Sequence, residues 1–91
     1  MNTPNIAVIG AGYWGKNLVR NMAQLERLHS VCDASSTVRA SVRAAYPSVR
    51  VTAALDDILR DPEVQGVMVV VPSAAHYEVA LASLQAGKHT Y

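Results

Sequence analysis

The sequence predicts an α/β fold in which a doubly wound parallel sheet of about four to five strands carries helices on both faces. Two observations predict it. Short apolar, β-prone runs alternate along the whole chain with stretches whose apolar residues recur at helical spacing. One of those runs, the unbroken "VMVVV" at 67–71, is typical of a strand that is covered on both faces.

The chain begins with a buried strand and an amphipathic helix. Residues 6–9 are apolar and β-prone and end at a glycine, which predicts a buried strand. In the next segment Leu18, Met22 and Leu25 recur at i, i+4 and i+7, so they are expected to form the apolar face of a helix. A second strand is predicted at 28–33.

The middle of the chain predicts two shorter units. The hydroxyl residues at 35–37 are candidate N-caps for a helix that Pro47 ends. A brief strand is expected at 49–52, and a short helix should follow it and stop before Pro62. The acidic pair Asp56–Asp57 fits the first turn of that short helix better than a pair of catalytic carboxylates.

The last third of the chain predicts a buried strand, a long helix and the start of a fifth strand. The strand at 67–71 leads through Pro72 into a helix for which Ser73 is a candidate cap. Gly87 is the residue expected just past the end of this helix, and residues 88–91 enter the fifth strand. The apolar face of the helix is expected to consist of Tyr77, Leu81 and Leu84.

Length, composition and charge describe one small domain over residues 1–91. The chain is 51% hydrophobic and 16% charged, which is typical of a folded globular protein. Its net charge of +1 comes from dispersed basic residues, which excludes the concentrated basic face of a nucleic-acid-binding protein. A single cysteine, a start without a signal-peptide pattern, and apolar runs too short to span a bilayer together predict a cytoplasmic protein with no membrane segment.

The segment "GAGYWG" is a G-x-G-x-x-G motif that lies directly between the first strand and the first helix. Gly10 allows the tight turn out of the strand, Gly12 lets a pyrophosphate approach the bare backbone, and Gly15 lets the helix lie close to the strand. The backbone amides of Tyr13 and Trp14 are expected to face the same anion at the positive end of the helix dipole. The motif therefore predicts a dinucleotide site in a Rossmann-type fold.

Asp33, at the end of the second predicted strand, is the expected partner of the adenosine ribose. It follows Gly15 by about 20 residues, the spacing at which a carboxylate binds the ribose hydroxyls in such folds. A carboxylate here repels a 2′-phosphate, and residues 34–36 supply no arginine, so NAD is the favoured cofactor. NADP stays possible, because Arg39 on the next helix can reach toward the same place.

The other residue types that often form reactive sites show no recognised pattern. The three histidines and Cys32 lack the spacing of a zinc site, so no metal is predicted. Cys32 is expected to be a small core residue. His29 and His89 are expected to lie at strand edges and not to act as ligands.

Two stretches and their separation resemble the N-terminal half of the Gfo/Idh/MocA oxidoreductases: "IAVIGAGYWGKNLVRN" and "VMVVVPSAAHYEVALASLQAGKH". The resemblance covers essentially the whole chain and implies an NAD(P)-binding domain. It implies that Val71, Pro72 and Ser73 line the nicotinamide-side ribose and phosphate, and that His76 faces the cofactor. The segment "GYWGKN" is most similar to members that oxidise nucleotide-linked sugars.

The resemblance also implies what the chain does and what it lacks. Members of the family transfer hydride between a nicotinamide and a sugar or nucleotide-sugar hydroxyl, and their catalytic lysine lies in a Glu-Lys-Pro element that would follow Tyr91. The expectation is a truncated cofactor domain with no catalytic residue of its own, inactive alone, whose substrate binds only to a longer parent enzyme. An open edge on the strand at 67–71, together with uncovered helix faces, predicts that the fragment self-associates.

Two functions from other classes remain open. A dinucleotide-sensing module without enzymatic activity would use the same pocket to control a partner. An S-adenosylmethionine-dependent methyltransferase also combines a glycine loop with an acid after its second strand. Gly15 and the helix-bearing turn after Pro72 count against the methyltransferase.

Overall fold

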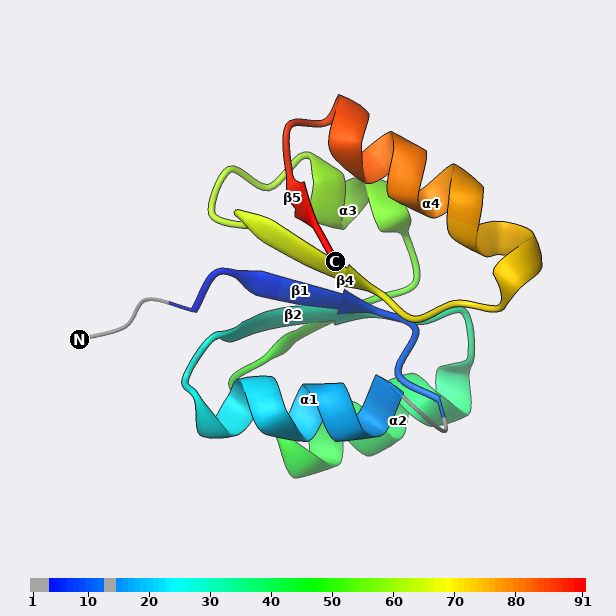
Figure 1. The fold of residues 1–91 in the computed structure, drawn as a ribbon. Helices are drawn as coiled ribbons and strands as arrows, with labels where there is room; N and C mark the ends of the chain where they lie inside the picture. The colour runs from blue at the N-terminus through cyan, green and yellow to red at the C-terminus, as the bar shows by residue number, and fades with distance from the viewer. Residues whose placement is uncertain (1–3, 13–14) are drawn as a thin grey trace.

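The computed structural model describes residues 4–12 and 15–91, which form a five-stranded parallel sheet with helices on both sides (Figure 1). The strand order is β3-β2-β1-β4-β5, so the chain proceeds outward from β1 first in one direction and then in the other. This topology confirms the predicted Rossmann-type doubly wound sheet. The elements in chain order are β1 (Ile6–Ile9), α1 (Gly15–Gln24), β2 (Leu28–Cys32), α2 (Ser36–Ala45), β3 (Arg50–Thr52), α3 (Leu55–Leu59), β4 (Gly66–Val69), α4 (Ser73–Gln85) and β5 (His89–Thr90).

The sheet separates two apolar layers, each covered by its own pair of helices. Helices α1 and α2 lie on one face, and α3 and α4 lie on the other (Figure 1). Because successive strand residues point to opposite faces, β1 contributes Val8 to the first layer, where it meets Val19 of α1. Its neighbours Ala7 and Ile9 belong to the second layer, with Ile58 of α3. The central strand is therefore buried on both faces, as a parallel sheet requires.

Helix α1 buries part of its predicted apolar face, whereas α4 buries a different face from the one that its apolar spacing predicted. In α1 the predicted Met22 packs against the core beside the buried Val19, whereas Leu25 lies past the helix end and is 58% exposed. In α4 the fully buried residue is Ser83, whose hydroxyl donates to the Val79 carbonyl one turn earlier at 2.8 Å. Small side chains let a helix approach the sheet closely, so they take the buried side in α4. The three predicted face residues of α4 are exposed: Tyr77, Leu81 and Leu84.

Two of the three predicted helix caps are confirmed. Ser35 is the N-cap of α2, and its Oγ accepts the backbone N–H three residues later at 3.3 Å. Gly87 follows α4 with φ +79, and its N–H and the next one bond back to the last turn in a Schellman arrangement. The prediction for α4's start is wrong: Ser73 is the first helical residue, and Pro72 holds the N-cap position, because its carbonyl accepts the first helical N–H bonds.

The outer edge of β4 is paired, and the prediction of an open edge there is wrong. Strand β5 pairs in parallel with Gly66–Val67. Tyr91 extends the ladder, because its N–H donates to the Val67 carbonyl at 2.9 Å and its carbonyl accepts the Val69 N–H at 3.0 Å. The free edge of the sheet on this side therefore belongs to β5. In the described part of the chain no helix combines the length and the apolarity needed to cross a membrane.

Candidate functional site

A cavity of about 760 Å³ opens beyond the carboxyl ends of β1, β2 and β4. Its volume falls within the roughly 300–1,000 Å³ of small-molecule sites. It lies where the strand order reverses between β1 and β4, which is the position at which open α/β sheets bind ligands. Six of the predicted site residues line it: Gly10, Gly12, Gly15, Asp33, Val71 and Pro72.

Of the other four predicted site residues, only His76 has a side chain that the structure describes. Tyr13 and Trp14 lie outside the described residues. Ser73 begins α4 directly after the lining residue Pro72. His76 is exposed in the first turn of α4, and it is not among the residues that surround the cavity.

Part of the lining was not predicted from the sequence, namely the turn after β3. Ala53 in this turn and Leu55 at the start of α3 line the same cavity as the glycine loop. The signal that predicted the rest of the site also applies to them, because β3 is parallel to its neighbours and its carboxyl end reaches the same edge. Cys32 and Ala34, on either side of Asp33, complete this wall.

The three loop glycines serve different steric needs. Gly10 has φ +91, and a Cβ built on it would lie 2.5 Å from the Val70 carbonyl oxygen. A Cβ on Gly15 would collide with the carbonyl of Gly10, so α1 can begin against the loop only with glycine there. A Cβ on Gly12 would meet nothing within 4 Å. Gly10 and Gly15 are therefore required because neighbouring backbone leaves no room for a side chain, whereas the backbone of Gly12 faces open space.

Asp33 connects the glycine loop to the start of α2. Its Oδ2 accepts the Ala11 N–H at 2.8 Å, and its Oδ1 accepts the Ser35 N–H at 2.8 Å. The Arg39 side chain lies beside it, with Nη1 donating to the carbonyl oxygens of Asp33 and Ala34, each at 2.9 Å. The carboxylate of Asp33 and the guanidinium of Arg39 therefore both lie at the carboxyl end of β2.

Cys32 confirms its predicted place in the core. It is 5% exposed, and burial raises the pKa of its thiol, with the negative charges of Asp33 and Asp57 adding to the effect. The thiol therefore stays protonated at neutral pH and packs as an apolar side chain. Cys32 lines the cavity, but its protonated thiol is not a nucleophile there.

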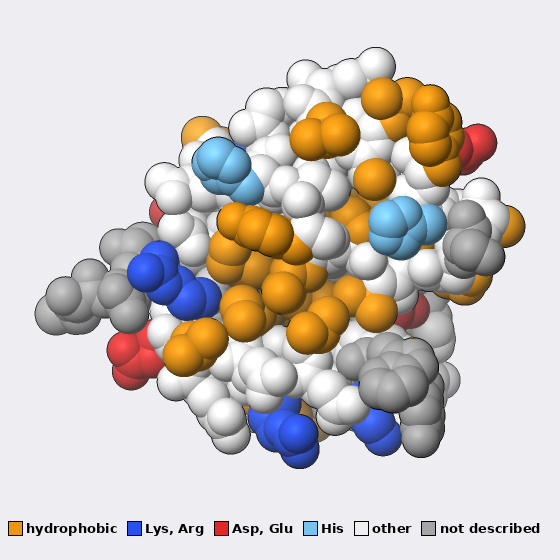
Figure 2. Space-filling view, viewed as in Figure 1, with side chains coloured by type: hydrophobic (Ala, Val, Ile, Leu, Met, Phe, Trp, Pro, Cys, Tyr) orange, Lys and Arg blue, Asp and Glu red, His pale blue; other side chains and the backbone are white. Residues whose placement is uncertain are grey.

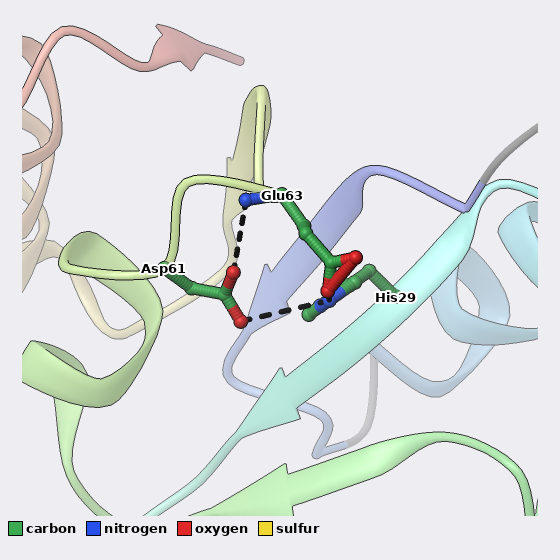
Figure 3. A group of neighbouring side chains, drawn as sticks. All are labelled: His29, Asp61 and Glu63. Carbon is green, nitrogen blue, oxygen red and sulfur yellow. Dashed lines mark hydrogen bonds and ion pairs between the residues drawn. The ribbon is translucent and has the colours of Figure 1, made fainter.

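A second group of ionisable side chains lies at the opposite, amino-terminal end of β2. His29 points from β2 toward two carboxylates of the segment between α3 and β4 (Figure 3), with Nε2 3.6 Å from Asp61 Oδ2 and 3.6 Å from Glu63 Oε1. Arg50 Nη1 lies 3.3 Å from the same oxygen of Asp61, and Lys88 Nζ donates to the Asp61 backbone carbonyl at 2.7 Å. Because Arg50 already forms an ion pair with the Asp61 carboxylate, we assign the group a structural role that joins β2, β3 and the segment between α3 and β4.

The chain matches the Gfo/Idh/MocA family, described as an oxidoreductase family with an NAD-binding Rossmann fold, over residues 4–91. Among curated relatives, UDP-N-acetylglucosamine 3-dehydrogenase of Acidithiobacillus ferrooxidans is 34% identical over 90% of this chain and 25% of its own length. The NADP⁺-dependent scyllo-inositol 2-dehydrogenase IolW of Bacillus subtilis is 27% identical over 98% of this chain and 25% of its own length. This chain spans 15–26% of the length of the curated relatives that it matches.

Solved structures agree with the family match. GenD2 from gentamicin A biosynthesis, in complex with NAD, superposes with a TM-score of 0.89 at 28% identity, over 99% of this chain and 26% of that one. The Acidithiobacillus ferrooxidans UDP-N-acetylglucosamine 3-dehydrogenase superposes with a TM-score of 0.85 at 31% identity, over 99% of this chain and 29% of that one. The matched sequence, the strand order and the glycine loop agree. This chain therefore belongs to the Gfo/Idh/MocA family of oxidoreductases, whose NAD-binding Rossmann fold its residues form.

Proposed function

We propose that the cavity binds NAD, and that the chain is the cofactor-binding part of an enzyme that transfers hydride between the nicotinamide and a hydroxyl group of a sugar-like substrate. One observation carries the proposal. The glycine loop, Asp33 and the Val71–Pro72 turn come from three separate strands and surround one cavity at the switch point of the sheet.

The residues of the cavity fit a dinucleotide. The bare backbone at Gly12 and the start of α1 would receive the pyrophosphate, because unpaired N–H groups and the helix dipole both favour an anion there. Asp33 would bind the adenosine ribose hydroxyls with the acceptor capacity that its two backbone bonds leave over. The turn at Val71–Pro72 would lie along the nicotinamide half, and His76 would reach it only from the exposed first turn of α4.

The cofactor supplies the hydride chemistry, and the described residues bind and orient it. Residues outside this chain would hold the substrate and exchange its proton, which is consistent with a chain that spans about a quarter of relatives such as IolW. The names of the relatives favour an inositol, a sugar or a nucleotide sugar as substrate. We place the protein in the cytoplasm, where its free cysteine stays reduced.

NAD is the proposed cofactor over NADP because of the Asp33 carboxylate, which repels a 2′-phosphate. Arg39 lies close enough to offset part of this repulsion, although its guanidinium is bonded to two carbonyl oxygens. We expect NAD⁺ to bind at least about tenfold more tightly than NADP⁺, a difference of about 1.4 kcal/mol. Asp33→Ser should reduce the difference in affinity between NAD⁺ and NADP⁺, and Arg39→Ala should increase it.

Calorimetric titration of the 91-residue chain with NAD⁺ and NADP⁺ tests the proposal. Saturable NAD⁺ binding is expected, and Gly12→Val should weaken it because a side chain would fill the approach to the backbone. Ala74→Val, an exposed position near the start of α4, is the matched control and should bind normally. If a folded chain binds neither dinucleotide at millimolar concentration, the proposed function is wrong.

Family membership favours the oxidoreductase over the methyltransferase. A dinucleotide-sensing module would use the same pocket but, unlike the oxidoreductase, would not convert the bound nucleotide. A parent protein that binds NAD⁺ but reduces none of it in the presence of inositols or nucleotide sugars would support the sensor.

A further inference from the structure

We propose that Asp33 is a positioning residue for the phosphate-binding loop, in addition to being the ribose ligand expected of it. The inference rests on the proposed function, and it concerns how the loop is held before any nucleotide arrives. The contact that carries it is the hydrogen bond from the Ala11 N–H to Asp33 Oδ2 at 2.8 Å.

The two bonds of the carboxylate have different characters. The bond from the Ser35 N–H to Oδ1 is local, because an aspartate commonly accepts the N–H two residues ahead in a turn. The bond from Ala11 joins two segments 22 residues apart in the chain. Only this second bond ties the glycine loop to the end of β2.

Asp33 is itself fixed in place, so it can act as an anchor. Its backbone N–H donates to the Thr52 carbonyl of β3 at 3.1 Å, and its carbonyl accepts a bond from Arg39. Its position therefore depends on β3 and α2 and not on the loop that it holds.

The bond at Ala11 fixes the loop at the residue directly before the exposed backbone of Gly12. The residue is 6% exposed, so its N–H would lack a partner if the carboxylate were removed. It lies between Gly10, whose N–H is already bonded to the Cys32 carbonyl at 2.8 Å, and Gly12, whose backbone faces open space. Fixing the Ala11 N–H therefore orients the peptide that leads to the proposed pyrophosphate position.

Anchoring the loop and binding ribose are compatible. An ionised carboxylate offers about four acceptor positions on its two oxygens. Ala11 and Ser35 occupy one each, which leaves acceptor capacity for two ribose hydroxyls. Asp33 can hold the loop and the sugar at the same time.

The two roles separate when the ligand has no hydroxyl for Asp33 to bind. The experiment titrates the chain and its Asp33→Ala variant with NAD⁺ and with an NAD⁺ analogue whose adenosine ribose lacks both hydroxyls. If Asp33 holds the loop, Asp33→Ala weakens the analogue about tenfold, the effect of one lost buried hydrogen bond, and weakens NAD⁺ further. If Asp33 only binds ribose, the chain and the variant bind the analogue equally, and the proposal is overturned.

Asp33→Ala removes both acceptor oxygens, so its effect on the loop can also be measured without nucleotide. Amide exchange by NMR without nucleotide gives an independent readout: the Ala11 amide should exchange at least about tenfold faster in Asp33→Ala, while the Val67 amide in β4 stays protected. Unchanged Ala11 exchange would contradict the proposal. Asp56→Asn removes an exposed carboxylate from α3 and should change neither measurement. Failure of the proposed function differs from both outcomes, because the unmodified chain would then bind neither ligand.

Discussion

The backbone of Gly10 passes so close to the carbonyl of Val70 that a Cβ on the glycine would lie 2.5 Å from that oxygen. The contact holds the turn after β1 against the end of β4, where the strand order reverses. Gly10 also has φ +91, a conformation that residues with a Cβ rarely adopt. Replacing Gly10 by any other residue would therefore cause both a steric clash with Val70 and backbone strain.

Gly10→Ala should lower the free energy of unfolding by about 2–3 kcal/mol, because alanine would strain the backbone and push β1 from β4. Gly12→Ala is the matched control, since nothing lies within 4 Å of its added methyl group. The control should change stability by no more than about 0.5 kcal/mol. Urea unfolding of the three chains measures the difference, and equal midpoints would show that the tight contact has no energetic weight.

Cys32 should react slowly with thiol reagents in the folded chain. Burial raises the pKa of the thiol, so less of the reactive thiolate is present at a given pH, and 5% exposure limits access as well. Alkylation at pH 8 should be slow, should accelerate on unfolding in urea, and should slow further when NAD⁺ fills the cavity that Cys32 borders. Mass spectrometry follows the single cysteine directly, and Cys32→Ser is the blank.

The same raised pKa gives the sign of a stability change with pH. The folded chain holds the thiol proton more tightly than the unfolded chain, so the contribution of Cys32 is fully present below the thiol's ordinary pKa. It is lost as the pH rises through the raised, folded-state value. Cys32→Ser should remove this part of the alkaline destabilisation, and an identical alkaline profile in both chains would contradict the assignment.

Asp61 should matter more for stability than Glu63, although both face His29 (Figure 3). The Asp61 side chain is 11% exposed, lies 3.3 Å from Arg50 and accepts the Glu63 N–H at 2.9 Å, whereas the Glu63 side chain is 71% exposed. Asp61→Asn should cost about 1–2 kcal/mol and Glu63→Gln about 0.5 kcal/mol or less. Comparable losses from the two amides in urea unfolding would show that burial does not set the difference.

Much of the fold could be predicted because its signals are local. The unbroken apolar run at 67–71, most of which lies in β4, the glycines at the start of α1 and the glycine after α4 each act through the backbone conformation of a few residues. The parallel arrangement then brings strand ends together, which is why the sequence predicts Asp33 and the Val71–Pro72 turn beside the glycine loop, where the structure has them.

The remaining features depend on distances that the sequence does not contain. The Ala11–Asp33 bond and the meeting of His29 with Asp61 join segments that are far apart in the chain. In α4, helical spacing identifies an apolar stripe but not which side of the helix meets the sheet. The small residues around Ser83 decide that, because they permit the closer approach.

The exposed apolar residues predict that the isolated chain self-associates. Tyr77, Leu81 and Leu84 are 73%, 40% and 60% exposed at helical spacing on α4, and Tyr91 next to β5 is 68% exposed. Apolar side chains also gather over the sheet between α1 and α4 (Figure 2). Exposed apolar surface is stabilised when another surface covers it.

Sedimentation velocity over a range of concentrations should therefore show that the sedimentation coefficient of the 91-residue chain rises with concentration. Leu84→Glu should reduce that rise, because it places a charge in the apolar stripe of α4. Gln85→Glu, the adjacent exposed position, introduces the same side chain outside the stripe and should leave association unchanged. A chain that sediments as a monomer at every concentration and melts cooperatively would show that these side chains tolerate solvent, and that the free edge of β5 is protected by its short length.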